Sequence, residues 1–330
     1  MTRVSNPVLR RLTEVAAMPD LPGGRYTLQE QLGEGGMGAV YSGYDESLDR
    51  EVAVKVAHAH TNGALAERLR AEARVLARLE HPGIVPVHDV GLLPDGRLFY
   101  VMKRVRGHTL TEWLREVLDL NRRLTVFERI CEAVAFAHEQ GIVHRDLKPD
   151  NIMVGAFGEV LVLDWGVAKL LSEMAAPQRT INANAVRTGD TLAGTVLGTP
   201  GFMAPEQAQG RPVDRRADVF ALGAILYQLL LDQPPAEDGL PAAELQKRRE
   251  LPKRLRAVCA KALAPAIDAR YPDASTLAEE IARYRAGRSV LAYRETAFDK
   301  IERTLLLYRT PILLVLAYLL MRVLIALFAR

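Results

Sequence analysis

The densest group of chemically capable residues in this chain is the segment HRDLKPDN at 144–151, which apolar runs flank on both sides. Six of its eight residues are polar, so it is not ordinary core, and the plain alternative is a solvated turn. Asp164 follows the apolar run VLVL, thirteen residues after Asn151. A carboxylate and an amide at the ends of neighbouring strands can bind one or two Mg²⁺ ions through oxygen. The spacing therefore indicates a metal site formed by two adjacent strand ends.

A glycine-rich segment, GEGGMGAV at 33–40, is the first of two motifs suited to phosphate. Val40 and Tyr41 continue it as a strand, which argues against a dinucleotide-binding turn because that motif needs a helix at this point. Glycines at the tip of a hairpin let backbone N–H groups approach phosphate oxygens without a Cβ in the way. An ordinary hairpin turn remains the alternative for this segment on its own.

Lys55, in the strand-like run EVAVKVA at 51–57, is the second such motif. A lysine inside a buried strand is unfavourable unless an anion meets it. The alternative is a lysine on an exposed strand. Glu72 lies on the following helix and is the partner we expect for Lys55, with Glu67 as the second choice. Such a pair would aim the ammonium group at nucleotide phosphates.

Two regions of different secondary structure are needed to position these motifs. Alternating β-branched residues predict strands in the first region, and helical periodicity predicts one helix there, ended by His81-Pro82-Gly83. From Thr109 onward the pattern is mainly helical. We therefore expect an α+β fold with a β-rich lobe at 26–103, a larger helical lobe at 108–287, and a cleft between them. The predicted strands are 26–45 (with a central turn), 51–57, 84–91 and 97–105, and the predicted helices are 63–80, 109–120, 124–140, 213–231, 251–263 and 273–287.

Composition limits the classes of protein to which this chain can belong. Its 330 residues suffice for one large two-lobed domain, and a formal net charge of +3 gives no reason to expect nucleic acid as a partner. Cys131 and Cys259 lie far apart in apolar helical stretches, which fits packed thiols in a reducing compartment. Residues 1–25 lack the continuous apolar run of a signal peptide, so we expect a short, loose leader.

Together these motifs resemble the protein kinase family, in particular the bacterial eukaryotic-like (Hanks-type) serine/threonine kinases, over residues 26–287. The resemblance implies a bilobal kinase fold that transfers the γ-phosphoryl group of ATP to protein serine and threonine hydroxyls, using Mg²⁺ or Mn²⁺. The catalytic residues that it implies are Asp146 as base, Lys148 beside the transferred group, and Lys55 with Glu72 at the nucleotide phosphates; the implied metal ligands are Asn151 and Asp164.

The same resemblance implies an ATP site between the lobes. The glycine-rich segment would cover the phosphates, and the backbone of Lys103 and Val105 would bind the adenine edge. Lys103 departs from the acidic residue common at its position, and Trp165 departs from the usual phenylalanine. The implied nucleotide-binding residues are Leu32, Gly33, Glu34, Gly35, Gly36, Met37, Gly38, Ala39, Val40, Ala53, Lys55, Met102 as gatekeeper, Lys103, Val105 and Met153.

The segment between Asp164 and Glu206 is long for a loop in a compact domain. Its GTPGF motif at 198–202 resembles the serine/threonine class of kinases. We expect autophosphorylation there, with the new phosphate pairing with Arg145; the alternative is that its threonines are merely polar loop residues. The candidate phosphosites are Thr188, Thr191 and Thr195, with Thr180 nearby, and the residues expected to act as scaffold are Arg145, Thr199, Glu206, Asp218 and Arg270.

Two other functions are consistent with parts of this pattern. A pseudokinase would bind ATP as a scaffold without transferring phosphate, although such proteins usually lack the lysine, the base or a metal ligand. A small-molecule phosphotransferase would share the base and metal residues but lack the 198–206 segment present here.

The C-terminus differs from the rest of the chain. Residues 311–329 form an apolar run of 19 residues interrupted by Arg322, close to the about 20 residues that span a bilayer. A basic segment at 288–309 precedes it, so the distribution of charge predicts a tail-anchored span at 310–329, with the kinase domain on the cytoplasmic side of the inner membrane. The alternative is a helix that lies on a membrane surface or on a partner. A homodimer would allow autophosphorylation in trans.

Overall fold

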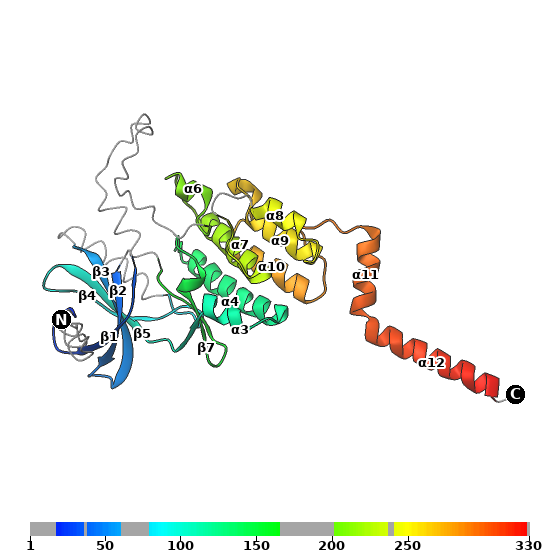
Figure 1. Ribbon diagram of the computed structural model, residues 1–330, viewed down its shortest axis with the longest axis horizontal. Coiled ribbons are helices and arrows are strands. Elements are labelled where there is room, and N and C mark those ends of the chain that lie inside the picture. Colours follow the sequence, from blue (N-terminus) through cyan, green and yellow to red (C-terminus); the bar gives the residue numbers. More distant parts are fainter. Residues whose placement is uncertain (1–17, 36–37, 61–78, 166–200, 237–240, 329–330) are drawn as a thin grey trace, which may run out of the picture.

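The computed structural model describes residues 18–35, 38–60, 79–165, 201–236 and 241–328. Within them the chain forms two lobes, a β-sheet on the N-terminal side and a group of helices on the C-terminal side (Figure 1). The expected α+β, two-lobed arrangement is therefore confirmed. The helix expected at 63–80 lies outside the described residues.

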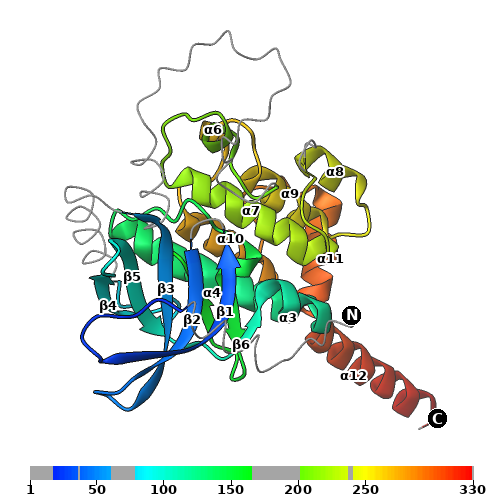
Figure 2. The ribbon, with the colours of Figure 1, turned by 60° about the vertical axis from the view of Figure 1, so that its left-hand side comes forward.

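The N-terminal lobe is a five-stranded antiparallel sheet with the order β1-β2-β3-β5-β4 (Figure 2). Its strands are β1 (Tyr26–Gly35), β2 (Gly38–Asp45), β3 (Arg50–His60), β4 (Val87–Leu92) and β5 (Arg97–Lys103). Side chains alternate along β3, so Val52, Val54 and Val56 pack in one buried cluster. Lys55 consequently lies on the opposite face of the sheet, the face that meets the C-terminal lobe.

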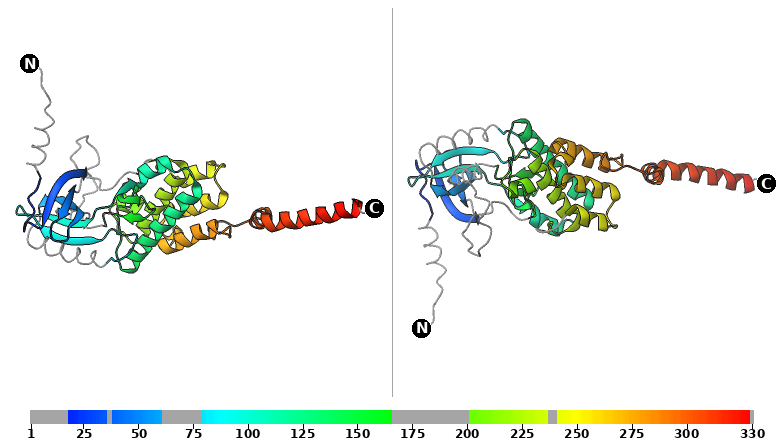
Figure 3. Two further views of the ribbon diagram at one scale, coloured as in Figure 1. Left: turned by 90° about the horizontal axis from the view of Figure 1, so that it is seen from below. Right: turned by 90° about the horizontal axis from the view of Figure 1, so that it is seen from above.

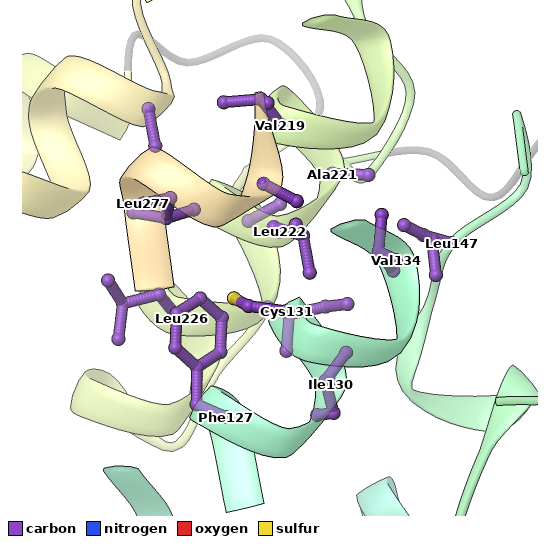
Figure 4. Close-up of a cluster of buried hydrophobic side chains, with 14 of the residues drawn as sticks. Phe127, Ile130, Cys131, Val134, Leu147, Val219, Ala221, Leu222, Leu226 and Leu277 are labelled. Atoms are coloured by element: carbon purple, nitrogen blue, oxygen red, sulfur yellow. The ribbon is translucent and has the colours of Figure 1, made fainter. Parts of the chain in front are cut away.

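The C-terminal lobe is built around α4 (Leu120–Glu139) and α7 (Arg216–Leu231). Thirteen of the sixteen residues of α7 are buried, as expected for a helix that other helices enclose. Figure 4 shows Cys131 of α4, Leu226 of α7 and Leu277 among the buried side chains that join these helices. The remaining helices of the lobe are α3 (Leu110–Glu116), α6 (Pro205–Ala208), α8 (Pro241–Lys247), α9 (Lys253–Ala262) and α10 (Ala274–Arg285), with 3-10 turns η1 (Pro149–Asn151) and η2 (Ile267–Ala269).

A three-stranded sheet of β6 (Gly107–Thr109), β7 (Ile152–Gly155) and β8 (Val160–Val162) carries the polar motifs. The segment 144–151 leads into β7, and Asp164 follows β8. Pairing of Ile152 with Val162 brings the start of β7 beside the end of β8. The two motifs therefore meet at one end of this sheet.

Leu21 and Arg25, within the predicted leader, contact the N-terminal lobe. Leu21 is buried in the same cluster as Val52. The Arg25 guanidinium donates two hydrogen bonds of 3.0 Å to the carboxylate of the fully buried Asp45. These contacts attach the segment to β2.

Packing of the C-terminal lobe continues beyond residue 287. Val290 is buried in the main core, and the buried Glu280 accepts hydrogen bonds from the backbone N–H groups of Leu291 and Ala292 at 2.9 and 2.8 Å. Helix α11 (Ala297–Leu307) is attached near its start, where Asp299 pairs with Lys253 of α9 at 3.0 Å.

Helix α12 (Arg309–Phe328) extends away from the C-terminal lobe (Figure 3). The α12 side chains that the structure describes are exposed, with Leu313 at 63% and Phe328 at 87%. Among the residues that the structure describes, no helix combines the length and the hydropathy that a membrane crossing requires. The helix expected at 310–329 is thus present, but the predicted span is not confirmed.

Candidate active site

Asp218, at the start of α7, holds the segment 144–151 in place through backbone hydrogen bonds. The Asp218 carboxylate accepts hydrogen bonds from the backbone N–H groups of His144 and Arg145 at 2.7 and 2.8 Å, and it lies 2.9 Å from His138 Nε2. Arg145 has a left-handed backbone with φ of 65°, a conformation that non-glycine residues adopt only when their surroundings hold them there. Asp218, predicted to be scaffold, provides that hold.

Within this segment, the side chains of Asp146, Lys148 and Asn151 lie close together. Asn151 Nδ2 donates to the Asp146 carbonyl at 2.8 Å and to Asp146 Oδ2 at 3.2 Å, and Lys148 Nζ is 3.5 Å from Asp146 Oδ2. Because the Asn151 nitrogen is used in this way, its amide oxygen is the atom left to accept a bond or bind a cation. The Asp146 side chain is 16% exposed, so solvent and a substrate can reach it.

Asp164 joins the two lobes. Its Oδ2 lies 2.6 Å from Lys55 Nζ on β3, and its Oδ1 accepts a hydrogen bond of 3.1 Å from the Tyr100 hydroxyl on β5. Burial alone would raise the pKa of Asp164, but the charge and hydrogen bond of Lys55, together with the Tyr100 hydroxyl, hold that pKa below its ordinary value. Asp164 is therefore an ionised carboxylate at neutral pH.

Sequence reasoning missed Tyr100. The signal that could have found it is the two-residue alternation along β5, which puts Tyr100 on the same face as Met102. That alternation identifies a face, whereas contact with Asp164 depends on how the lobes meet.

Trp165 packs beside the segment 144–151. Its ring lies 4.8 Å from the His144 ring, and its indole N–H donates to the Val162 carbonyl at 3.2 Å. The larger ring and the extra N–H that replace phenylalanine are thus both accommodated. His144 Nδ1 accepts from the Asp146 N–H at 3.3 Å, so its Nε2 carries the proton and donates to the Leu163 carbonyl at 2.8 Å.

The predicted adenine-binding residues gather beneath the sheet. Ala53 and Met102 are paired across β3 and β5 and form a small cluster with Val40 and Val105. The Lys103 N–H bonds to the Pro86 carbonyl at 3.1 Å, at the end of β5.

The remaining predicted nucleotide contacts lie at the edges of this region. Met153 is on β7 of the C-terminal lobe, and Leu32 is 47% exposed on β1. The glycines of the glycine-rich segment at 33–40 have different surroundings. A Cβ on Gly38 would lie 2.3 Å from the Val56 carbonyl oxygen, so packing of β2 against β3 requires glycine there. A Cβ on Gly33 or Gly35 would meet no atom of the described residues within 4 Å.

Glu206 and Arg270, both expected to act as scaffold, form a buried ion pair. Two hydrogen bonds of 2.6 and 2.7 Å join the guanidinium to both carboxylate oxygens. The adjacent Gln207 donates to the Arg145 carbonyl at 2.9 Å, which connects α6 to the catalytic segment. Of the predicted site residues, the structure thus joins Lys55 to Asp164, and Asp146 to both Lys148 and Asn151. The predicted residues that lie outside the described residues are Gly36, Met37, Glu67, Glu72, Thr180, Thr188, Thr191, Thr195 and Thr199.

Comparison with known proteins agrees with this geometry. The family described as the protein kinase domain matches residues 26–286. The serine/threonine-protein kinase PknD of Chlamydia trachomatis serovar D is 34% identical over 325 residues, covering 88% of this chain and 34% of that protein. The PknD proteins of Chlamydia felis and Protochlamydia amoebophila are 35% and 34% identical; each match covers 80% of this chain, and 31% and 30% of the relative. The chain spans about a third of the length of these relatives. It belongs to the protein kinase family, in its bacterial Hanks-type serine/threonine branch.

Proposed function

We propose that this chain transfers the γ-phosphoryl group of Mg·ATP to serine and threonine hydroxyls of proteins. The observation that carries the proposal is the convergence of Lys55 from β3 with Asp164 after β8, next to the group formed by Asp146, Lys148 and Asn151. This reaction needs a cation, an ionised carboxylate, an amide oxygen and a solvent-accessible carboxylate.

The metal ligands fit the chemistry of Mg²⁺. The ionised Asp164 offers carboxylate oxygens as metal ligands. The Asn151 nitrogen makes the hydrogen bonds to Asp146, so the amide oxygen of Asn151 is the atom that would bind the metal. Mg²⁺ takes oxygen ligands and usually binds through one or two carboxylates together with substrate phosphates. When bound, the metal would neutralise charge on the phosphate oxygens.

The nucleotide would lie between the lobes, with adenine near Ala53 and Met102. Among the described residues, no atom lies within 4 Å of the place where a Cβ of Gly33 or Gly35 would be, so packing against them does not explain these glycines. Close approach of backbone N–H groups to phosphate oxygens does explain them. Gly38 differs, because contact with Val56 already requires glycine there.

These residues would catalyse transfer mainly by positioning the substrate hydroxyl and the transferred group. Asp146 would accept the hydrogen of the substrate hydroxyl and orient its oxygen, and Lys148 would stabilise charge on the transferred group. Asp218 and the Arg145 backbone would keep Asp146 in place, since both N–H groups that precede Asp146 bond to Asp218.

Transfer of labelled phosphate from ATP to a basic acceptor protein tests the function. The wild-type chain should label the acceptor, and Asp146→Ala should not. Asp268→Asn is the matched control, because it also removes one carboxylate, but at a position 97% exposed on η2. Nucleotide binding without labelling would favour the pseudokinase alternative, and labelling of an aminoglycoside in place of protein would favour the small-molecule phosphotransferase.

We propose that activity is regulated by autophosphorylation on Thr188, Thr191 or Thr195, in trans within a homodimer. The support is the position of Arg145, which directly precedes the base and is linked through its backbone to both Asp218 and Gln207. Phosphopeptide mapping of the wild type against Asp146→Asn tests this, and equal phosphate on both proteins would contradict it.

We propose that α12 inserts its apolar surface into a lipid bilayer and so attaches the kinase domain to the cytoplasmic side of a membrane. The support is that consecutive residues from Leu313 to Leu316 are all exposed at 55% or more, so apolar surface faces every direction around the helix. A partner with one groove would cover only one side. Extraction of membranes with sodium carbonate tests the proposal, and release of the protein would contradict it.

A further inference from the structure

The carboxylate of Asp164 has a separate donor on each oxygen. Lys55 Nζ lies 2.6 Å from Oδ2, and the Tyr100 hydroxyl lies 3.1 Å from Oδ1. Lys55 belongs to a predicted motif, although Glu72 was its expected partner there and Asp164 was not; no sequence motif includes Tyr100. Since both donors belong to the sheet of the N-terminal lobe, that lobe sets the orientation of a carboxylate that belongs to the C-terminal lobe.

Tyr100 reaches this point because of its place on β5. Its neighbours Phe99 and Val101 pack in the buried cluster of the N-terminal lobe. The intervening side chain therefore points to the opposite face, into a cavity that Asp164 and Trp165 also line.

Within the described residues, the surroundings of the Tyr100 hydroxyl offer it one charged acceptor, the Asp164 carboxylate. Apart from Asp164, the cavity is lined by apolar and aromatic residues such as Leu79, Val90 and Met102. A hydroxyl removed from water needs a hydrogen-bond partner, and an ionised carboxylate is a strong one. At 3.1 Å from Asp164 Oδ1, the hydroxyl is the donor of this bond, because an ionised carboxylate can only accept.

We propose that Tyr100 is a positioning residue for metal binding: its hydroxyl fixes the plane of the Asp164 carboxylate in the orientation that receives Mg²⁺. The inference rests on the proposed function, because it takes Asp164 to be a metal ligand. Rotation about the last bond of an aspartate side chain is broad, so a single donor leaves the carboxylate free to turn. A second donor on the other oxygen removes that freedom. An ionised carboxylate has about four lone-pair sites, so two donors still leave sites for a metal.

The predicted effect is on metal affinity rather than on turnover. Removing a group that hydrogen-bonds a metal ligand changes metal affinity or activity by about 10- to 100-fold. Tyr100→Phe removes the hydroxyl and keeps the ring, so the packing of the cavity is retained. We expect the Mg²⁺ concentration at half-maximal effect to rise about tenfold or more, with the rate at saturating Mg²⁺ close to that of the wild type.

The experiment is a Mg²⁺ titration of the full chain with two readouts, the initial rate of phosphate transfer and the calorimetric affinity for ADP. The matched control is Tyr271→Phe, because Tyr271 is also buried but its hydroxyl has no hydrogen-bond partner within the described residues. The control should leave the Mg²⁺ midpoint in place. A raised midpoint for Tyr100→Phe in both readouts supports the proposal.

Two results would overturn it. One is a Mg²⁺ midpoint and a rate that are both unchanged in Tyr100→Phe. The other is an unchanged midpoint with a lower rate at every Mg²⁺ concentration, which a purely structural role would produce. The binding readout separates this inference from the proposed function. If the wild type binds ADP with Mg²⁺ but transfers no phosphate, the proposed function fails and the binding midpoints still decide the role of Tyr100. If Mg²⁺ does not affect ADP binding to the wild type, both are overturned.

Discussion

Replacing Glu206 by glutamine should destabilise the protein strongly, although the change removes only one charge. Glu206 and Arg270 have side-chain exposures of 4% and 0%, and two short hydrogen bonds join them. Arg270 also donates to the carbonyls of Ala264, Arg216 and Pro265 at 2.8, 3.0 and 3.2 Å. The glutamine would leave a buried guanidinium with hydrogen bonds but without its counter-charge.

The magnitude follows from that geometry. Removing one partner of a buried ion pair costs about 3–5 kcal/mol, because the other charge stays buried and uncompensated. Three carbonyls and the glutamine oxygen would still bond to Arg270, so we expect the lower end, about 3 kcal/mol. For a domain of this size, that loss corresponds to a fall of about 6–12 °C in Tm.

The assay is urea denaturation followed by far-UV circular dichroism, with a thermal scan of the same samples. Asp268→Asn is the control, because it breaks an arginine pair of 2.6 Å whose carboxylate is 97% exposed, and such pairs contribute about 0–1 kcal/mol. A loss below about 1 kcal/mol for Glu206→Gln, equal to that of the control, would refute the reasoning that burial makes this pair matter.

Three further predictions follow from contacts in the two lobes. Asp218→Asn should lower kcat by about 100-fold while the KM for ATP changes little, because an amide nitrogen cannot accept the backbone bonds that position the base; steady-state kinetics checks this. Gly38→Ala should lower stability by about 1–3 kcal/mol, because its Cβ would lie 2.3 Å from the Val56 carbonyl, and Tm measures it. Cys131 and Cys259 should not react with a thiol reagent at pH 8 until urea unfolds the protein, because burial raises both thiol pKa values and keeps the reactive thiolate scarce.

The pattern of strands and helices along the chain was enough to predict the two-lobed fold, and the motifs identified the candidate site residues. Alternation in EVAVKVA puts Lys55 on the face opposite the valines, and the structure has this arrangement on β3. The turn between β7 and β8 likewise explains why the 144–151 segment meets Asp164. Both inferences needed only local periodicity and one strand pairing.

The two ends of the chain could not be predicted in the same way. Leu21 and Arg25 follow no strand or helix pattern, so their burial against β2 has no local signal. Val290 lies in a basic stretch that resembles a linker, yet it packs in the main core. In each case a few apolar or charged side chains find partners that are distant in sequence.

Residue type and spacing by themselves determined which groups can do chemistry here, because strand alternation and motif order are properties of neighbouring residues. The tertiary structure alone decided which of those groups touch. Tyr100 and Asp164 are 64 residues apart and Arg145 and Asp218 are 73 apart, so their bonds depend on how a sheet and a helix are packed around them. A hydrogen bond forms only within a few tenths of an ångström of its ideal length, and local periodicity does not define distances between elements with that precision.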